Sequence, residues 1–240
     1  MQLPQARRTD LGGPVHWVDL GGPSDGPLLV CVHGLGGSHV NWLALAPLLT
    51  PTCRVVALDL AGFGRTRGHG RSTSVQANAD LVHRFLTEVT EVTEVTGGPA
   101  ILVGNSMGGL VTALEAASHP EEVAGVVLVG PALPSAVPAP GVGKRFIARR
   151  RRVGTQLRTI MCPVLLVHGA LDRLVHVASA RAAAKAHPHW RYAELPGIGH
   201  VPQLEAPDRT AGIIFDWLAD EGAEATSRTR STMSRTRSTT

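Results

Sequence analysis

The sequence predicts an α/β protein with a mostly parallel, doubly wound sheet that is flanked by helices. Short apolar runs bounded by Gly or Pro recur along the chain, and they are continuous instead of alternating, which is typical of strands buried on both faces. Helical stretches lie between these runs, and this alternation favours crossover connections and a parallel sheet. With 240 residues, of which 43% are hydrophobic, the chain can bury a core without a metal or disulfide staple.

The expected elements follow from the residue patterns in chain order. The opening segment Val15–Leu20 is followed by Gly21, Gly22 and Pro23, which indicates an antiparallel edge hairpin. The predicted core strands are Leu28–Val32, Val55–Leu58, Ala100–Val103, Val126–Val129, Val164–Val167 and Trp190–Leu195. The predicted helices are Trp42–Leu49, Ser74–Val95, Met107–Ser118 and Val177–His187, and a last amphipathic helix carries Ala211, Ile214, Phe215 and Leu218 at helical spacing.

Charge and cysteine content exclude several classes of protein. The formal net charge is +4, but seven positive residues cluster between Lys144 and Arg158, so the basic balance is local. The chain has four Trp, one Tyr and four Phe, too few exposed aromatics for a basic nucleic-acid module, and we expect no nucleic-acid partner. Three distant cysteines, Cys31, Cys53 and Cys162, favour a reducing, cytoplasmic location. No apolar run approaches the ~18 residues that a membrane span requires, so we also expect no transmembrane helix.

The predicted domain organisation is a single α/β domain over residues 1–220 and a disordered Ser/Arg/Thr tail over 221–240. The tail contains two copies of SRTRST and has almost nothing to bury. Residues 131–162 form an excursion between two strands, with a proline-rich loop over Pro131–Pro140 and one basic helix over Val142–Ile160. The EVT repeat of Glu88–Thr96 is predicted to be a solvated helix end.

The sequence Gly104-Asn105-Ser106-Met107-Gly108-Gly109 contains the pattern G-x-S-x-G directly after a predicted buried strand and before a helix. In that context the pattern predicts a tight turn that pushes the Ser106 hydroxyl out of the sheet as a nucleophile. The backbone N–H groups at the helix N-terminus favour negative charge there. A glycine- and serine-rich turn without chemistry remains the alternative for this motif alone.

A serine nucleophile needs a base and an acid that orients it, and the chain offers both after later predicted strands. Asp172 comes after the strand Val164–Val167, and His200 lies in a glycine-rich loop after the strand Trp190–Leu195. Carboxyl ends of parallel strands meet at one sheet edge, so we expect Ser106, Asp172 and His200 to act as nucleophile, acid and base. For His200 alone, an ordinary hydrogen-bonding loop histidine would be the better interpretation.

An oxyanion hole is predicted from the segment His33-Gly34-Leu35-Gly36-Gly37-Ser38, which follows the first core strand. The backbone N–H groups of Leu35 and Met107 are the expected donors to a tetrahedral oxyanion. A dinucleotide-binding G-x-G-x-x-G fails because position 39 is His39, and Gly143-Lys144 fails as a phosphate loop because Arg145 follows the lysine. We therefore predict no cofactor and no catalytic metal.

These motifs, HGLGGS, GNSMGG and the Asp172 and His200 loops, resemble the α/β-hydrolase superfamily over roughly Val15–Leu218. The segment Asp59–Thr66 is similar to that family's D-x-x-G-x-G-x-S/T turn, interpreted as a loop that packs beneath the active site. The resemblance implies an esterase-like or lipase-like serine hydrolase that needs no cofactor and forms an acyl-serine intermediate. The residues expected to support the site are His33, Gly34, Gly36, Gly104 and Gly108.

The chain departs from the family pattern between Gly130 and Pro163, where related enzymes insert a helical cap and only residues 131–162 intervene here. We predict a carboxylesterase-type enzyme acting on small esters in an open site, with a homodimer as one way to cover it. Thioesterase, lactonase, perhydrolase and hydroxynitrile lyase chemistry stay open, as does a non-catalytic ligand-binding homologue. Dehalogenase and epoxide hydrolase activities are disfavoured, since those relatives carry aspartate where Ser106 stands.

Overall fold

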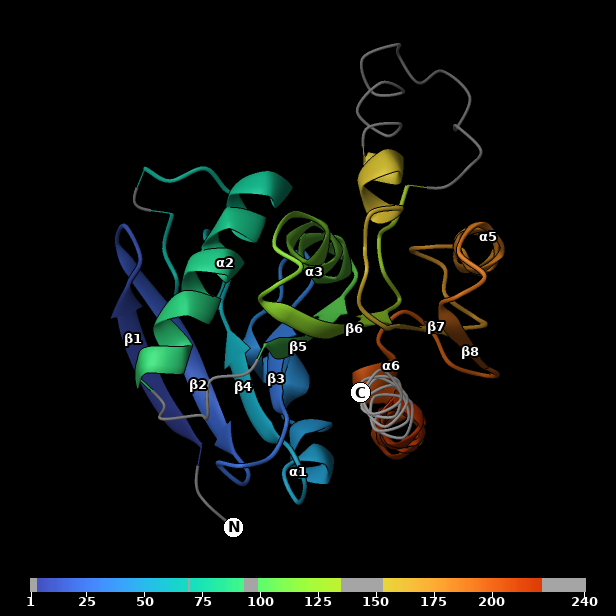
Figure 1. Cartoon of the computed structure of the whole chain (residues 1–240), viewed down its shortest axis with the longest axis horizontal. Helices are drawn as coiled ribbons and strands as arrows, with labels where there is room; N and C mark the ends of the chain where they lie inside the picture. The colour runs from blue at the N-terminus through green and yellow to red at the C-terminus, as the bar shows by residue number, and fades with distance from the viewer. Residues whose placement is uncertain (1–3, 69, 93–98, 135–152, 222–240) are drawn as a thin grey trace, which may run out of the picture.

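A computed structural model of the chain describes residues 4–68, 70–92, 99–134 and 153–221, and its strands form one eight-stranded sheet with helices on both sides (Figure 1). The strand order is β1-β2-β4-β3-β5-β6-β7-β8. From β4 onward every neighbouring pair is parallel, whereas β1 and β2 add antiparallel strands at one edge. The predicted mostly parallel, doubly wound sheet is confirmed.

The element bounds are close to those expected from the sequence. The strands are β1 (Gln5–Asp10), β2 (Pro14–Gly21), β3 (Leu28–Val32), β4 (Arg54–Leu58), β5 (Ala100–Asn105), β6 (Val123–Val129), β7 (Val164–Gly169) and β8 (Arg191–Leu195). The helices are η1 (His39–Trp42), α1 (Ala46–Leu49), α2 (Val75–Val92), α3 (Met107–Ser118), α5 (Val177–Ala186) and α6 (Pro202–Glu205). Residues 153–157 and 207–221 are also helical.

One local prediction is confirmed in part and another is wrong. The segment Val15–Leu20 does belong to an antiparallel hairpin at the sheet edge, but it is the inner strand of that hairpin, because β1 pairs with β2 and β2 pairs with β4. The edge strand is the polar segment Gln5–Asp10, whose mostly exposed residues leave no hydrophobic pattern to detect. The predicted helix Trp42–Leu49 is split into η1 and α1, and Pro47 lies in the first turn of α1, where proline begins a helix instead of continuing one.

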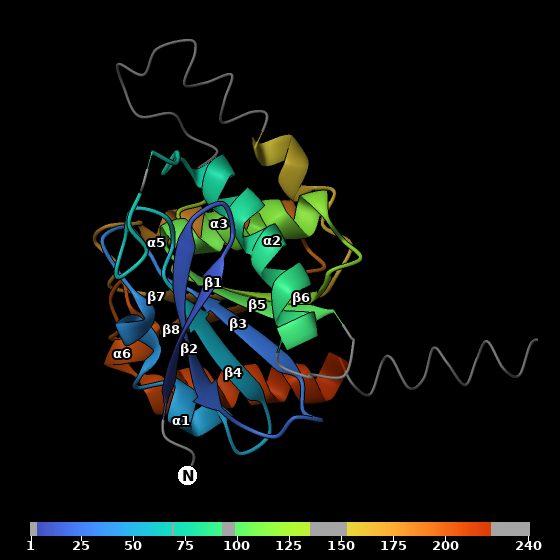
Figure 2. The ribbon, with the colours of Figure 1, turned by 90° about the vertical axis from the view of Figure 1, so that its left-hand side faces the viewer.

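The helices cover the two faces of the sheet in separate layers. In Figures 1 and 2, α2, α3 and α5 lie on one face, and α1, α6 and the helix of residues 207–221 lie on the other. Strand β3 is buried on both sides: Val30 and Val32 pack into one hydrophobic cluster, and Leu29 and Cys31 pack into the other. Burial of both faces explains why the core strands are continuous apolar runs.

Several predicted segments lie wholly or partly outside the described residues. They are the end of the EVT repeat after residue 92, the proline-rich loop after residue 134, the basic helix before residue 153, and the tail over 222–240. Glu221, the first residue of the predicted tail, belongs to the last described helix. Within the described ranges, no helix combines the length and apolar character that crossing a bilayer requires.

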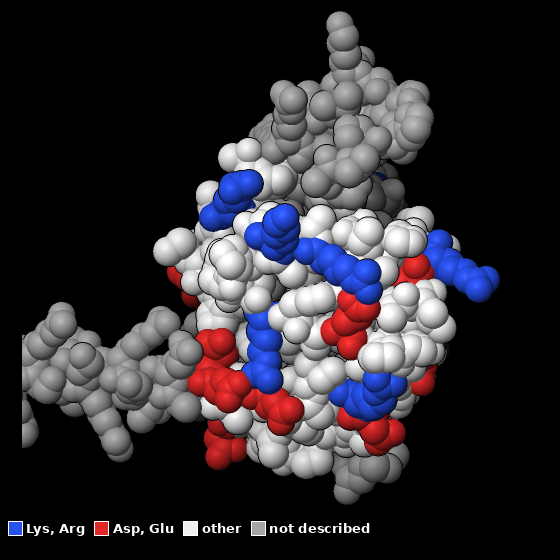
Figure 3. All heavy atoms as spheres, turned by 90° about the vertical axis from the view of Figure 1, so that its right-hand side faces the viewer, with Lys and Arg blue, Asp and Glu red and all other residues white. Residues whose placement is uncertain are grey.

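Charged side chains of both signs are interspersed on the face of the molecule shown in Figure 3. Two ion pairs join β8 to other elements: Arg181 of α5 lies 2.6 Å from Glu194, and Arg191 pairs with Asp220. Both pairs are largely exposed, so each contributes little to stability.

Helix α3 packs very closely against the sheet where β3 ends. A Cβ atom placed on Gly108 would lie 2.2 Å from the carbonyl oxygen of Val32 and 2.5 Å from that of His33. These neighbours are backbone atoms that cannot move without displacing the strand. The absence of a side chain at Gly108 therefore fixes how closely the start of α3, and with it Ser106, approaches the loop after β3.

We expect Gly108→Ala to destabilise the fold by about 3 kcal/mol or more, because the added methyl group overlaps the carbonyl groups of β3. Gly212→Ala is the matched control. Gly212 lies within the helix of residues 207–221, and a methyl group added there would meet no atom within 4 Å, so alanine should stabilise by about 0.5–1 kcal/mol. Urea unfolding curves of the two variants measure both effects, and equal stabilities would contradict the close-packing argument.

Candidate active site

The three residues predicted as nucleophile, acid and base all follow the carboxyl ends of parallel strands. Ser106 follows β5, Asp172 lies in the loop after β7, and His200 lies in the loop after β8. Parallel strands end at the same edge of the sheet, and in open α/β sheets this edge is where ligands bind. The described structure therefore gathers these side chains on one side of the molecule.

Ser106 occupies the tight turn between β5 and α3. Its backbone has φ 53° and ψ −117°, and among the described residues it is the only non-glycine residue with positive φ. This conformation is strained for an L-residue and costs about 1–3 kcal/mol. The turn is held by hydrogen bonds from the Ser106 N–H to Val129 (3.1 Å) and from the Ala132 N–H to the Ser106 carbonyl (2.9 Å). Its half-buried hydroxyl has no hydrogen-bond partner among the described residues.

Asp172 and His200 are in direct contact. His200 Nδ1 lies 2.7 Å from Asp172 Oδ2, with the carboxylate fully buried and the imidazole 14% exposed. The backbone N–H groups of Leu174 and Val175 donate to Asp172 Oδ1 at 2.8 and 2.9 Å. With Oδ1 occupied in this way, the carboxylate is oriented so that Oδ2 accepts the Nδ1 proton of His200, and Nε2 is left for other partners.

A second histidine also approaches Asp172. His168 Nε2 lies 3.3 Å from Asp172 Oδ2 and 2.8 Å from the carbonyl of Val175, to which it donates. Burial lowers the pKa of His168 below its usual value, so the ring is held neutral beside the carboxylate. This residue therefore braces the Asp172 loop from the side of β7.

Two residues that sequence reasoning missed hold the His200 loop in place. The amide of Asn105, which precedes Ser106, donates to the carbonyls of Val129 (2.9 Å) and His200 (3.3 Å). The carboxylate of Glu205 accepts from Gly199 N (2.8 Å) and Val201 N (3.0 Å), the two neighbours of His200. The asparagine lies inside the G-x-S-x-G pattern and Glu205 lies five residues after His200, but neither spacing by itself identifies the contact.

The loop after β3 lies directly against Ser106. A Cβ atom on Gly34 would be 3.0 Å from Ser106 Cβ, and Gly36 has φ 73°, which favours glycine. His33 is fully buried; its Nδ1 donates to the Gly34 carbonyl at 2.7 Å, and its Nε2 accepts from Leu60 N at 3.0 Å. Both ring nitrogens are thus used to hold the loop backbone, and the predicted role of this residue in supporting an active site stays a prediction.

The predicted oxyanion donors lie on the two segments that meet at this point. Leu35 is exposed in the loop after β3, and Met107 is the first residue of α3. The Leu35 N–H donates to no described backbone carbonyl, and the Met107 N–H is one of the free donors that begin every helix. Gly104, inside β5, faces Gly108 and Thr112 of α3, where a Cβ would be 2.5 Å from each.

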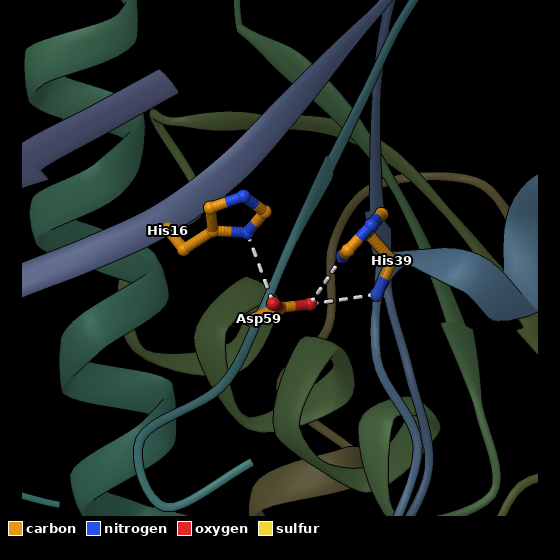
Figure 4. Close-up of side chains that lie close together, drawn as sticks. All are labelled: His16, His39 and Asp59. Carbon is orange, nitrogen blue, oxygen red and sulfur yellow. Dashed lines mark hydrogen bonds and ion pairs between the residues drawn. The ribbon is translucent and has the colours of Figure 1, made fainter. Parts of the chain in front are cut away.

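Asp59 directly follows β4 and connects the loop after β3 to β2, through contacts with His39 and His16 (Figure 4). Its Oδ1 accepts from the backbone N–H of His39 (2.7 Å) and lies 3.0 Å from His39 Nδ1. Its Oδ2 accepts from Arg65 N (2.8 Å) and lies 3.0 Å from His16 Nδ1. The turn over Asp59–Thr66 is therefore a junction of three segments and not only the packing loop that the sequence suggested.

The buried groups of this junction are held in defined protonation states. Burial alone would raise the pKa of Asp59, but hydrogen bonds from Arg65 and His39 lower it below its ordinary value. Burial lowers the pKa of His16 and of His33. At neutral pH the Asp59 carboxylate is therefore ionised, and His16 and His33 are neutral, with His16 donating to Asp59 through Nδ1.

Comparison with known families identifies the first half of the chain. Residues 27–148 match the model of the family described as alpha/beta hydrolase fold. This range contains the loop after β3, Asp59 and Ser106, whereas Asp172 and His200 lie beyond it.

Curated relatives have several different activities. The chain is 36% identical over 132 residues to a dihydrolipoyllysine-residue acetyltransferase component of an acetoin cleaving system from Pseudomonas putida, covering 55% of the chain but only 34% of that protein. It is 28% identical to a magnesium-chelatase 30 kDa subunit of Rhodobacter capsulatus, covering 86% and 92% of the two chains. A pimeloyl-[acyl-carrier protein] methyl ester esterase of Aromatoleum aromaticum is also 28% identical, with 79% and 97% covered.

Solved structures give the same fold over almost the full length. The crystal structure of a membrane phospholipase A, described as a bacterial virulence factor, superimposes with a TM-score of 0.73 at 25% identity. The match covers 90% of this chain and 86% of that one. Since it extends past the family match, the likeness includes the strands that precede Asp172 and His200.

We expect the free energy of unfolding to fall as the pH drops below about 6.5, the pKa of an unperturbed histidine. Burial lowers the pKa of His16 and His33 in the folded chain, so the unfolded chain binds more protons and stability rises with pH. His16→Asn keeps an N–H donor for Asp59 but cannot titrate, so it should remove up to about 1.4 kcal/mol per pH unit from this slope. Urea melts at several pH values measure the slope, and a slope in His16→Asn equal to that of the wild type would contradict the role of His16.

Proposed function

Because the chain belongs to the alpha/beta hydrolase family, we propose that it is a serine hydrolase that cleaves small carboxylic esters through an acyl-serine intermediate. The observation that carries the proposal is the 2.7 Å contact between His200 Nδ1 and Asp172 Oδ2 at the sheet edge where Ser106 occupies its strained turn. A buried acid that orients a partly exposed imidazole, at the same sheet edge as an unpaired serine hydroxyl, is the arrangement that activates a serine.

In the proposed first half-reaction, Ser106 Oγ attacks the ester carbonyl and His200 Nε2 takes its proton. Asp172 keeps the Nδ1 proton on His200 and stabilises the imidazolium that forms. The tetrahedral oxyanion accepts hydrogen bonds from the backbone N–H groups of Leu35 and Met107, whose dipoles are fixed before the reaction begins. Collapse of this intermediate breaks the bond to the alcohol, which leaves with the proton from His200.

In the second half-reaction, water replaces the alcohol and the steps run in reverse. His200 takes a proton from water as it attacks the acyl-serine, and then returns that proton to Ser106 Oγ as the carboxylic acid leaves. Asn105 and Glu205 support both half-reactions by fixing the backbone of the His200 loop on either side of the imidazole. Asp59 supports them by holding His39, and so the end of the loop that carries Leu35.

Exposed apolar side chains on the same loops favour an apolar organic ester. Leu35 on the loop after β3, Leu171 and Leu174 beside Asp172, and Leu204 on α6 are 76%, 61%, 79% and 40% exposed. Large apolar residues on loops that flank polar reactive groups are typical of sites for small organic molecules. The similarity to a protein named as a methyl ester esterase supports ester hydrolysis in particular.

A ligand-binding role without turnover is the second candidate. It is favoured by the similarity to a magnesium-chelatase subunit over 86% of this chain. The two candidates differ in whether Ser106 is chemically activated, and a fluorophosphonate probe tests this property directly.

We expect the wild-type protein to be labelled by the fluorophosphonate and to hydrolyse p-nitrophenyl acetate. Ser106→Ala should abolish labelling and lower kcat by about 10⁶-fold, and Asp172→Asn should lower it by about 10⁴-fold. The control is Ser179→Ala on α5, which should retain full activity. If the wild type is not labelled, the ligand-binding candidate is favoured; if Ser106→Ala is still labelled, the nucleophile lies elsewhere.

We further expect acetate to butyrate esters to be the best substrates. Full burial of each methylene contributes about 0.8 kcal/mol, or about fourfold in kcat/KM, and a site with only exposed apolar side chains gives a smaller gain. p-Nitrophenyl esters with two to twelve carbons, assayed below their micelle concentrations with a sizing measurement, test this expectation. A monomer that prefers the ten- or twelve-carbon ester would contradict the open site. Assays of the matching thioesters and of lactones show whether the protein hydrolyses those bonds faster than esters.

A further inference from the structure

A second cluster of metal-ligating residues lies on the opposite end of α3 from Ser106. His83 of α2, Glu115 of α3 and His119 at the end of α3 converge on one point between the two helices. Figures 1 and 2 place α2 and α3 side by side on the same face of the sheet. We propose that these three residues bind a divalent transition-metal ion of the Zn²⁺ type. This proposal is independent of the reaction at Ser106.

The donor atoms already have spacings close to those of a tetrahedral metal site. His83 Nδ1 lies 3.2 Å and His119 Nδ1 lies 3.1 Å from Glu115 Oε1, and all three donor atoms are within 4.8 Å of one another. Zinc bonds of about 2.0–2.1 Å to imidazole nitrogen and carboxylate oxygen place neighbouring ligand atoms about 3.3 Å apart in a tetrahedron. A donor set of two imidazoles and a carboxylate also binds Zn²⁺, Cu²⁺ and Ni²⁺ in preference to Mg²⁺ or Ca²⁺.

The cluster combines a buried anion with histidines that reach solvent. The Glu115 side chain is 1% exposed, whereas each of the two imidazoles is 31% exposed. Among the described contacts of Glu115, the two imidazoles are the only groups that donate to its carboxylate, and no lysine or arginine pairs with it. A dication would balance this buried anion, and water could complete its coordination from the exposed side.

The imidazole rings must turn for an ion to bind. They are stacked, with centroids 3.7 Å apart and planes 17° from parallel. In this arrangement the planes in which the ring nitrogens could coordinate are nearly parallel and do not meet at one ion. The Nδ1 proton of each ring must also move to Nε2 so that Nδ1 can coordinate. The one-third exposure of both rings leaves room for this rotation and places Nε2–H within reach of water.

The other histidine–carboxylate cluster is less suited to a metal. Both oxygens of Asp59 already accept a backbone N–H as well as an imidazole donor. His16 is 3% exposed, and a Cβ on Gly64 would lie 2.4 Å from the Asp59 carboxylate, so the group is enclosed by backbone. Coordination through His16 Nδ1 would also leave its Nε2–H buried without an acceptor, because that atom has no partner now.

An ion at His83, Glu115 and His119 would join α2 to the C-terminal end of α3. The 12 residues of α3 span about 18 Å, so the ion would be too far from Ser106 to take part in the reaction. Its expected effect is on stability. Binding to the folded chain alone should raise the melting temperature by about 5–10 °C when the free ion is a hundred times its Kd.

The test uses the full chain without a histidine tag, treated with a chelator and then dialysed. Calorimetric titration with Zn²⁺ should give one bound ion per chain, and the melting temperature should rise with the Zn²⁺ concentration. His83→Gln and His119→Gln should each weaken binding at least about tenfold, since even partners outside the first coordination shell contribute 10- to 100-fold. His189→Gln is the control and should bind as the wild type does, because His189 is exposed and contacts no carboxylate in the part of the chain that the structure describes.

Copper provides a readout that does not depend on stability. The electron paramagnetic resonance spectrum of one equivalent of Cu²⁺ should show coupling to two imidazole nitrogens, and to one in each of the two glutamine variants. The proposal is overturned if Zn²⁺ up to about 1 mM produces neither heat nor a shift in melting temperature. It is also overturned if both variants bind like the wild type, or if His189→Gln abolishes binding.

Discussion

The close contact between the start of α3 and the end of β3 is the constraint on which the rest of the site depends. Gly108 lets the helix backbone come so near the Val32 and His33 carbonyls that no side chain fits between them. This approach forces the chain at Ser106 into a left-handed conformation and brings Gly34 against the serine. The strain is offset by the buried strands on both sides, which contribute far more than the cost of one unfavourable residue.

Buried carboxylates that each contact two histidines recur in this protein. Six of the eleven histidines take part. The three groups are Asp59 with His16 and His39, Asp172 with His200 and His168, and Glu115 with His83 and His119. What differs between the three groups is how much solvent reaches them and how many backbone N–H groups donate to the carboxylate.

Asp59 is enclosed and both of its oxygens accept hydrogen bonds, which suits a structural junction. Asp172 also accepts from backbone N–H groups, but one of its imidazoles is partly exposed for the proposed proton transfer. Glu115 has two accessible imidazoles and no backbone N–H donor among its described contacts.

The loops at the sheet edge are more tightly held than their length suggests. Asn105 ties the Ser106 turn to His200, Glu205 holds both neighbours of His200, and Asp59 holds His39 on the loop after β3. Rigid positioning of this kind reduces the reorganisation that a reaction requires. The exposed leucines on these loops lie outside that hydrogen-bonded frame, so under the proposed function substrate preference can vary while Ser106, Asp172 and His200 stay in place.

The sequence by itself determined the sheet, because strands buried on both faces must be continuous apolar runs, and it determined the order in which Ser106, Asp172 and His200 follow strand ends. These features depend on neighbours in the chain. Only the tertiary structure decided that Gln5–Asp10 pairs at the edge, that Asn105 contacts residue 200, and that His83 meets Glu115 across two helices. Such contacts join residues far apart in sequence, and the polar side chains that make them carry no periodic pattern. Their partners are set by how the helices pack on the sheet, which local sequence does not encode.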